Sequence, residues 1–219
     1  DIDTSDFQGR LSKGGLTLEP KQHFESEAQV CPLADKFIQG WEVAAGLQYG
    51  RPDFRFRFEG SHIEEREPAP GTRSLHLSEH GHMTETLHIK RIYNTYPVPP
   101  EEFQVTPEVE VLWDRYCRFV EGREPLLAMA YFCLSFIERG NRTQAAQHYS
   151  IQSDVLKKLG ELTSTRGDKA TARKLSSTTE PLSSSEATWI ESAIKEIIKH
   201  LATLRPGQIL KMTDLPLWT

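Results

Sequence analysis

The sequence contains little cysteine and no hydrophobic run long enough to cross a membrane. Its longest apolar stretch, residues 126–137, is interrupted only by Ser135 and falls short of the roughly 20 residues that a membrane-spanning helix needs. The three cysteines, Cys31, Cys117 and Cys133, are odd in number and widely spaced, which makes a disulfide framework a poor fit. The first residues are polar and acidic, unlike a secretory signal peptide. We therefore expect a cytoplasmic protein without membrane contact, in which Cys117 and Cys133 are buried thiols.

The sequence also lacks the short motifs that accompany many enzymatic reactions. It has no GxGxxG loop or P-loop for phosphate binding, no GxSxG nucleophile elbow and no HExxH zinc motif. We therefore expect no cofactor, and a non-enzymatic role is favoured over an enzymatic one.

Positive charge is scarce except in one segment. The 219 residues include 26 Lys and Arg against 31 Asp and Glu, a net charge of -5 that excludes a generally basic nucleic-acid coat. Residues 139–174 carry 8 Lys and Arg against 3 Asp and Glu, a local net charge of +5. Residues 1–106 carry 11 against 17. Any binding of a polyanion should therefore use the segment 139–174.

Residues 12–96 predict a small antiparallel β unit. Apolar residues fall on odd positions from Phe37 to Tyr49, and they alternate again with arginines from Phe54 to Phe58. Gly and Pro at 50–53 predict the turn between these two strands, and the Leu16–Leu18 pattern predicts an earlier short strand. The phenylalanines would form the inner, aromatic face of this unit.

The pattern becomes helical after a proline-rich connection at 97–106. Thr106 and Pro107 provide a capping hydroxyl and a proline suited to the first helical position. Residues 107–204 predict a domain of four or five helices, with a Ser/Thr-rich linker at 175–185 before the last helix. Ser183 and Glu186 have the spacing of a capping box for that helix. The chain is therefore predicted to be an α+β protein.

One part of the basic segment resembles the helix-turn-helix of DNA-binding proteins. The resemblance covers Arg142 to Glu161 and depends on small or apolar residues that let two helices cross closely. These places are filled by Ala145, Ala146, Tyr149, Ile151, Leu156 and Leu159. The ninth place of the family's pattern is usually a glycine in a left-handed turn, and here it is Ser150. The alternative is a pair of ordinary bundle helices.

The resemblance implies a set of side chains that would touch nucleic acid. Gln152, Ser153 and Lys157, with Asp154 beside them, would lie on the second helix and face the groove. The remaining basic side chains would neutralise phosphates, and they are Lys158, Arg166, Lys169, Arg173 and Lys174. Asp154 disfavours close phosphate contact, although an acid suits a helix N-terminus.

The same segment also resembles HEPN ribonucleases, in which an Arg and a His a few residues apart act on the RNA backbone. Arg142 and His148 are separated by five residues and follow a predicted long helix. Under this alternative the two would be catalytic, with Arg142 holding the phosphate and His148 moving a proton, and no metal would be needed. The alternative without function is a surface arginine and a partly buried histidine.

Four histidines cluster at His76, His80, His82 and His88. In extended chain they share one face, so that a metal could be bound, but the sequence shows only proximity, and the solvated face of a hairpin explains them better. We therefore expect no metal site.

Together these patterns favour a non-enzymatic regulatory or interaction protein that contacts nucleic acid through 142–174. DNA or RNA would be one partner, and a protein partner or self-association is expected as well. A HEPN-like ribonuclease and a structural interaction subunit without nucleic acid remain the alternatives.

Overall fold

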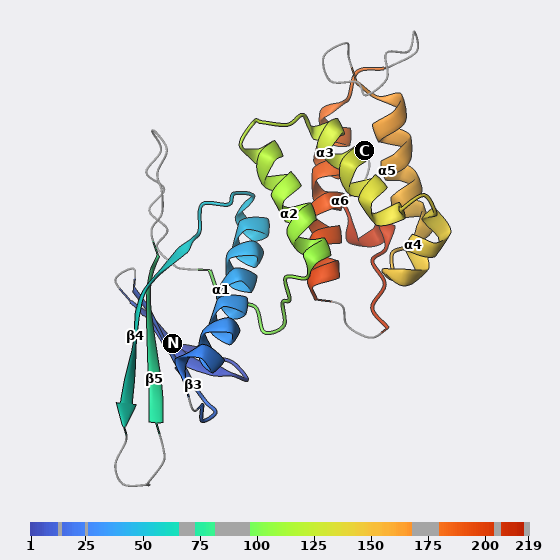
Figure 1. Cartoon of the computed structure of the whole chain (residues 1–219). Coiled ribbons are helices and arrows are strands. Elements are labelled where there is room, and N and C mark those ends of the chain that lie inside the picture. The colour runs from blue at the N-terminus through green and yellow to red at the C-terminus, as the bar shows by residue number, and fades with distance from the viewer. Residues whose placement is uncertain are drawn as a thin grey trace. The chain divides into compact units, whose positions relative to one another are not determined.

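A computed structural model of the chain describes residues 1–12, 15–24, 26–65, 73–81, 97–167, 180–203 and 207–216. The fold is α+β, as the sequence predicts. The chain divides into two compact units, Asp1–Val105 and Thr106–Thr219 (Figure 1). The division lies at the end of the proline-rich connection, and each unit is described separately below.

The first unit contains an antiparallel sheet in the strand order β1-β2-β3-β5-β4. Its strands are β1 (Ile2–Asp3), β2 (Phe7–Ser12), β3 (Gly15–Pro20), β4 (Phe56–Glu65) and β5 (Arg73–Gly81). The predicted early strand at Leu16–Leu18 is confirmed, because both leucines lie in β3 and are buried. The predicted region beyond Gly81, residues 82–96, lies outside the described residues.

The prediction of a strand at Phe37–Tyr49 is wrong, because these residues belong to helix α1 (Glu27–Tyr49). The same odd-numbered positions include Phe37, Trp41 and Ala45, which are four residues apart and therefore also lie along one face of a helix. The glycine that was expected to start a hairpin turn instead ends the helix. Gly50 has φ 68° and ψ 24°, and its N–H bonds to the carbonyl of Gly46.

Helix α1 packs on the sheet through its apolar face. Its core residues meet those of the first three strands, and the shared cluster contains Val30, Ala34, Ile38, Trp41, Ile2, Phe7, Leu16 and Leu18. The ring of Trp41 lies 5.6 Å from that of Phe54 and 5.1 Å from that of Phe56. Its Nε1 donates a buried hydrogen bond of 3.1 Å to the carbonyl oxygen of Pro97. The predicted aromatic face therefore exists, but it packs against a helix.

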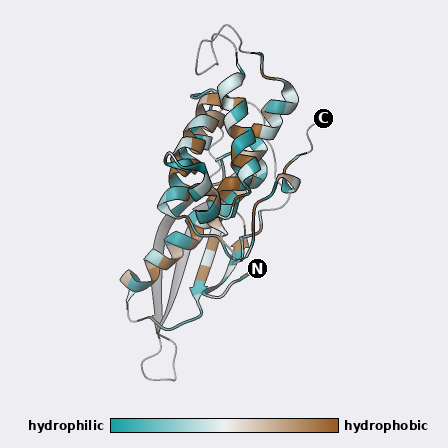
Figure 2. Ribbon diagram, turned by 90° about the vertical axis from the view of Figure 1, so that its right-hand side faces the viewer, coloured by the Kyte–Doolittle hydropathy of each residue, from teal (hydrophilic) through white to brown (hydrophobic). Residues whose placement is uncertain are grey.

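The second unit is helical. Its elements are α2 (Pro107–Val120), α3 (Leu126–Glu138), α4 (Arg142–His148), α5 (Ser153–Thr165), α6 (Ser184–Ala202) and the short 3-10 helix η1 (Met212–Asp214). Hydrophobic and hydrophilic residues follow one another along the helices, as Figure 2 shows. The apolar stripe predicted for the last helix is buried throughout, and it consists of Trp189, Ile190, Ala193, Ile194, Ile197, Ile198 and Leu201. Cys117 and Cys133 are buried thiols, as predicted. Burial raises the pKa of Cys133 to about 12.

Both predicted helix starts are confirmed. Thr106 Oγ1 accepts a hydrogen bond from the N–H of Val109, with Pro107 as the first helical residue. Ser183 and Glu186 form the reciprocal capping box of α6. The predicted linker 175–185 extends two residues too far, because α6 already begins at Ser184, and its residues 175–179 lie outside the described residues. In the part of the chain that the structure describes, no helix has the length and apolarity needed to span a bilayer.

Candidate nucleic-acid interface

Helices α4 and α5 are joined by a tight turn at the place where the helix-turn-helix pattern predicts one. Helix α4 ends at His148 and α5 begins at Ser153, and Figure 1 shows α4 at the lower end of α5. Ser150 has φ 51°, so this serine adopts the left-handed conformation that glycine usually supplies. The departure of the sequence from the family's pattern therefore changes the residue and leaves the backbone conformation in place.

The apolar places of the pattern form the contact between the two helices and the rest of the unit. Ala145, Tyr149 and Ile151 are buried, and so are Leu156 and Leu159. The remaining one of these six residues, Ala146, is partly buried. The small side chains at 145 and 146 permit the close crossing of α4 and α5, because they add little bulk between the two backbones.

Two further segments hold the turn, and the sequence patterns did not indicate either. The buried side chain of His200 in α6 donates from Nε2 to the carbonyl oxygen of Tyr149, 2.9 Å away. The C-terminal segment, residues 207–216, passes beside the turn, where Leu210 and Ile151 form an isolated parallel bridge. The N–H of Leu210 donates to the oxygen of Ser150 at 3.0 Å, and the N–H of Gln152 donates to the oxygen of Leu210 at 2.8 Å. In the sequence, the apolar pair Ile209 and Leu210 beyond the last predicted helix is the feature that could have drawn attention to this segment.

The surface of α5 carries the side chains predicted to face a groove. Gln152, Asp154 and Lys157 are exposed, whereas Ser153 and Lys158 are partly exposed. Lys157 pairs with Asp154 at 3.1 Å, and Lys158 pairs with Glu161 at 3.2 Å. Pairs of this kind on an exposed helix face contribute only about 0.3–0.5 kcal/mol. Lys157, whose pair lies on an exposed face of the helix, can therefore turn to another anion with little loss.

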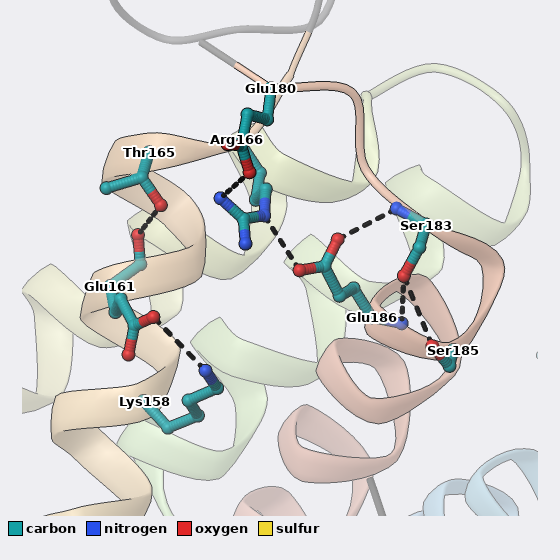
Figure 3. A network of polar contacts seen from close by, with 8 residues as sticks. All are labelled: Lys158, Glu161, Thr165, Arg166, Glu180, Ser183, Ser185 and Glu186. Carbon is teal, nitrogen blue, oxygen red and sulfur yellow. Dashed lines mark hydrogen bonds and ion pairs between the residues drawn. The ribbon is translucent and has the colours of Figure 1, made fainter. Parts of the chain in front are cut away.

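Arg166 differs from the two lysines in its contacts, because it pairs with carboxylates outside α5, as Figure 3 shows. At the end of α5 its Nε donates to Glu186 Oε1 at 2.7 Å, and its Nη1 lies 2.8 Å from Glu180 Oε2. Burial alone raises the pKa of Glu186, but hydrogen bonds from the Ser183 N–H and Arg166 outweigh it, so this pKa is lowered. The bond to Glu186 raises the pKa of Arg166. Arg166 thus links α5 to α6 and has two carboxylates as partners.

The remaining predicted phosphate contacts cannot be placed in the same way. Lys169, Arg173 and Lys174 lie outside the described residues. Of the side chains predicted to neutralise phosphates, the structure therefore describes Lys158 and Arg166, and Arg166 is paired with two carboxylates.

Helix α4 carries both residues of the ribonuclease alternative without bringing them together. Arg142 pairs with Glu138 of α3, and a Cβ added to Gly160 of α5 would lie 2.6 Å from Nη2 of Arg142. His148 is exposed, and its ring meets that of Tyr149 edge-on at 4.6 Å. Six residues along an α-helix correspond to about 9 Å along its axis and about 120° around it. Within one chain, the two side chains thus leave α4 in different directions.

No metal centre emerges from the described residues, among which no group of three or more His, Cys, Asp or Glu side chains converges. His76 and His80 belong to β5, where His76 is opposite His62 of β4 in the register. His82 and His88 lie outside the described residues.

Comparisons with known proteins give no family model, no curated protein and no solved structure that matches the chain. The two family resemblances therefore depend on the residues and geometry of this chain alone. The features of this chain that agree with the helix-turn-helix pattern are the left-handed conformation of Ser150 and the burial of Ala145, Tyr149, Ile151, Leu156 and Leu159.

Proposed function

We propose that the protein is a non-enzymatic regulatory or interaction protein that binds duplex nucleic acid through α4, the turn at 149–152 and α5. The observation that carries the proposal is the left-handed backbone of Ser150, which joins two helices whose packing places are all buried or partly buried. This arrangement exposes one face of the N-terminal half of α5, with Asp154 and Lys157, and this half is the part of a recognition helix that enters a major groove.

The polar residues at the start of α5 suit this role. Gln152 and Ser153 can hydrogen-bond to base edges, since an amide and a hydroxyl both contain donors and acceptors. Lys157 and Lys158 supply positive charge to the flanking phosphates. Asp154, the partner of Lys157, is a weak competitor because both members of this pair are exposed. Binding should consequently depend on salt concentration.

The test is fluorescence anisotropy of the full chain with labelled duplex DNA and with labelled single-stranded RNA, across a series of salt concentrations. Lys157→Ala and Lys158→Ala should each weaken duplex binding and reduce the slope of log affinity against log salt by about 1. The matched control is Arg118→Ala, which removes one charge from a similar exposed pair with Asp114 in α2. The control should bind like the parent chain.

Three outcomes would contradict the proposal. Binding of neither nucleic acid, down to low salt, would leave the protein as a structural interaction subunit. Equal losses in the lysine variants and in Arg118→Ala would show general electrostatics without a defined surface. Shortening of the RNA on a gel would make the protein a ribonuclease and return Arg142 and His148 to the centre of the account.

A further inference from the structure

The turn between α4 and α5 receives hydrogen bonds from outside these two helices. The carbonyl oxygen of Tyr149, the residue after α4, accepts from Nε2 of the buried His200 in α6 at 2.9 Å. The next carbonyl, that of Ser150, accepts from the N–H of Leu210 at 3.0 Å. The N–H of Gln152 donates to the oxygen of Leu210 at 2.8 Å. These polar backbone groups are therefore satisfied by α6 and by the segment that follows it.

The bond from His200 is fixed in direction and in place. A carbonyl oxygen can only accept, so the ring nitrogen that faces it carries the hydrogen. The side chain is 5% exposed and lies in the last turn of α6, whose apolar stripe is buried. The core of the helical unit therefore holds this donor, and without it the carbonyl of the buried Tyr149 would lose its partner.

Two of these bonds together fix the backbone of Ser150. Its φ and ψ describe how the two planar peptide groups on either side of its Cα are rotated. His200 holds the first of these groups through the oxygen of Tyr149, and Leu210 holds the second through the oxygen of Ser150. The resulting φ of 51° is one that an L-residue adopts less readily than glycine. The turn therefore needs these outside bonds more than a glycine turn would.

We propose that His200 is a positioning residue for nucleic-acid binding, because its hydrogen bond keeps Ser150 in the conformation that sets the direction of α5 relative to α4. The proposal rests on the proposed function, since the surface that is positioned is the one assigned there. His200 is buried and acts through the turn. The last helix of the unit thereby determines how α5 presents Asp154 and Lys157 to a ligand.

Two substitutions separate the hydrogen bond from the bulk of the ring. His200→Phe keeps a planar ring and removes the donor, whereas His200→Gln keeps an N–H donor at about the reach of Nε2. Ser150→Gly makes the turn less dependent on the bond, because glycine adopts positive φ freely. The control is Ile190→Val, which removes one buried methylene from α6 at about 15 Å along the helix axis from His200.

Fluorescence anisotropy of the full chain with labelled duplex DNA measures the effect, and circular dichroism checks that each variant is folded. We expect His200→Phe to bind about tenfold more weakly than the parent chain, the effect of leaving one buried carbonyl unpaired. His200→Gln should recover most of the affinity. The loss caused by His200→Phe should be smaller in a Ser150→Gly background. Ile190→Val should bind like the parent chain, although urea unfolds it more readily.

An equal loss in both backgrounds would overturn the proposal, because His200 would then stabilise the unit without acting through Ser150. Parent-like binding by His200→Phe would overturn it as well, and so would equally weak binding by His200→Gln and His200→Phe. If His200→Phe does not fold, the same comparison is made with His200→Asn, whose shorter amide falls short of the carbonyl. Failure of the proposed function differs from these results, because the parent chain would then bind no duplex, which would overturn both proposals.

Discussion

Arg166 at the end of α5 donates a hydrogen bond of 2.7 Å to Glu186 in the first turn of α6. The same carboxylate accepts the N–H of Ser183, so one buried glutamate caps its own helix and binds the preceding one. In the sequence, Arg166 and Glu186 are separated by residues that include 168–179, which lie outside the described residues. The hydrogen bond holds the C-terminal end of α5, whereas Asp154 and Lys157 near its N-terminal end are exposed.

Replacing Glu186 by Gln should reduce the free energy of unfolding by about 1–2 kcal/mol at pH 7, because the charge-assisted bond to Arg166 is lost. The lowered pKa of Glu186 also gives a pH dependence. Its stabilisation is complete above the ordinary glutamate pKa of about 4.3 and is lost as pH falls from there through the lowered value. Urea unfolding of parent and Glu186→Gln from pH 7 downward should show the two converging in acid. Glu196→Gln, a partly exposed change in the same helix, is the control, and a difference that is independent of pH would contradict this account.

Replacing Ser150 by Gly should raise stability by about 0.5 kcal/mol. The left-handed conformation costs an L-residue about 1–2 kcal/mol, which exceeds the entropic penalty of about 0.5–1 kcal/mol for glycine. Ser150→Val should lower stability by at least about 1 kcal/mol, because a β-branched residue resists positive φ. Chemical denaturation measures both variants. If both have the stability of the parent chain, the turn does not have φ 51° in solution.

We expect neither the parent chain nor His148→Ala to cleave RNA. Arg142 is paired with Glu138, and α4 sends the two side chains in different directions. Incubation of parent and variant with single-stranded RNA, followed by gel analysis, tests this expectation. Cleavage by the parent that is absent in a folded His148→Ala variant would establish the ribonuclease alternative.

Replacing Trp41 by Phe should destabilise the first unit by about 1–3 kcal/mol. The substitution leaves the buried carbonyl of Pro97 without the Nε1–H donor that now binds it at 3.1 Å. Leu33→Ala changes an exposed residue of the same helix and should alter stability by less than about 0.5 kcal/mol. Thermal melting followed by circular dichroism compares the two. Equal effects would show that the hydrogen bond contributes nothing.

Local signals in the sequence predicted much of the helical unit. Thr106 with Pro107, and Ser183 with Glu186, are interactions within a single helical turn, and such interactions can be recognised from spacing alone. The strand prediction at Phe37–Tyr49 failed because odd-numbered apolar positions also include the four-residue steps of a helix. What distinguishes a helix from a strand here is tertiary packing, because the residues from Val30 to Trp41 that contact the sheet are spaced as one face of a helix.

The candidate surface, too, could be predicted from the sequence only in part. The spacing of small and apolar residues indicated the α4–turn–α5 arrangement, but the conformation of Ser150 had to be seen in the structure. The contacts of the turn with His200 and with residues 207–216 connect positions about fifty to sixty residues apart, as the pairs Tyr149–His200 and Gln152–Met212 show. No local pattern encodes contacts at such separations.

The most direct test of the central claim is a titration of 15N-labelled protein with duplex DNA, followed through the amide signals. We expect the largest shifts at residues 150–158, with further changes at 210–212 because that segment binds the turn. Amides of the first unit should shift little. The absence of shifts at 150–158, or shifts centred in residues 1–105, would contradict nucleic-acid binding by α4 and α5.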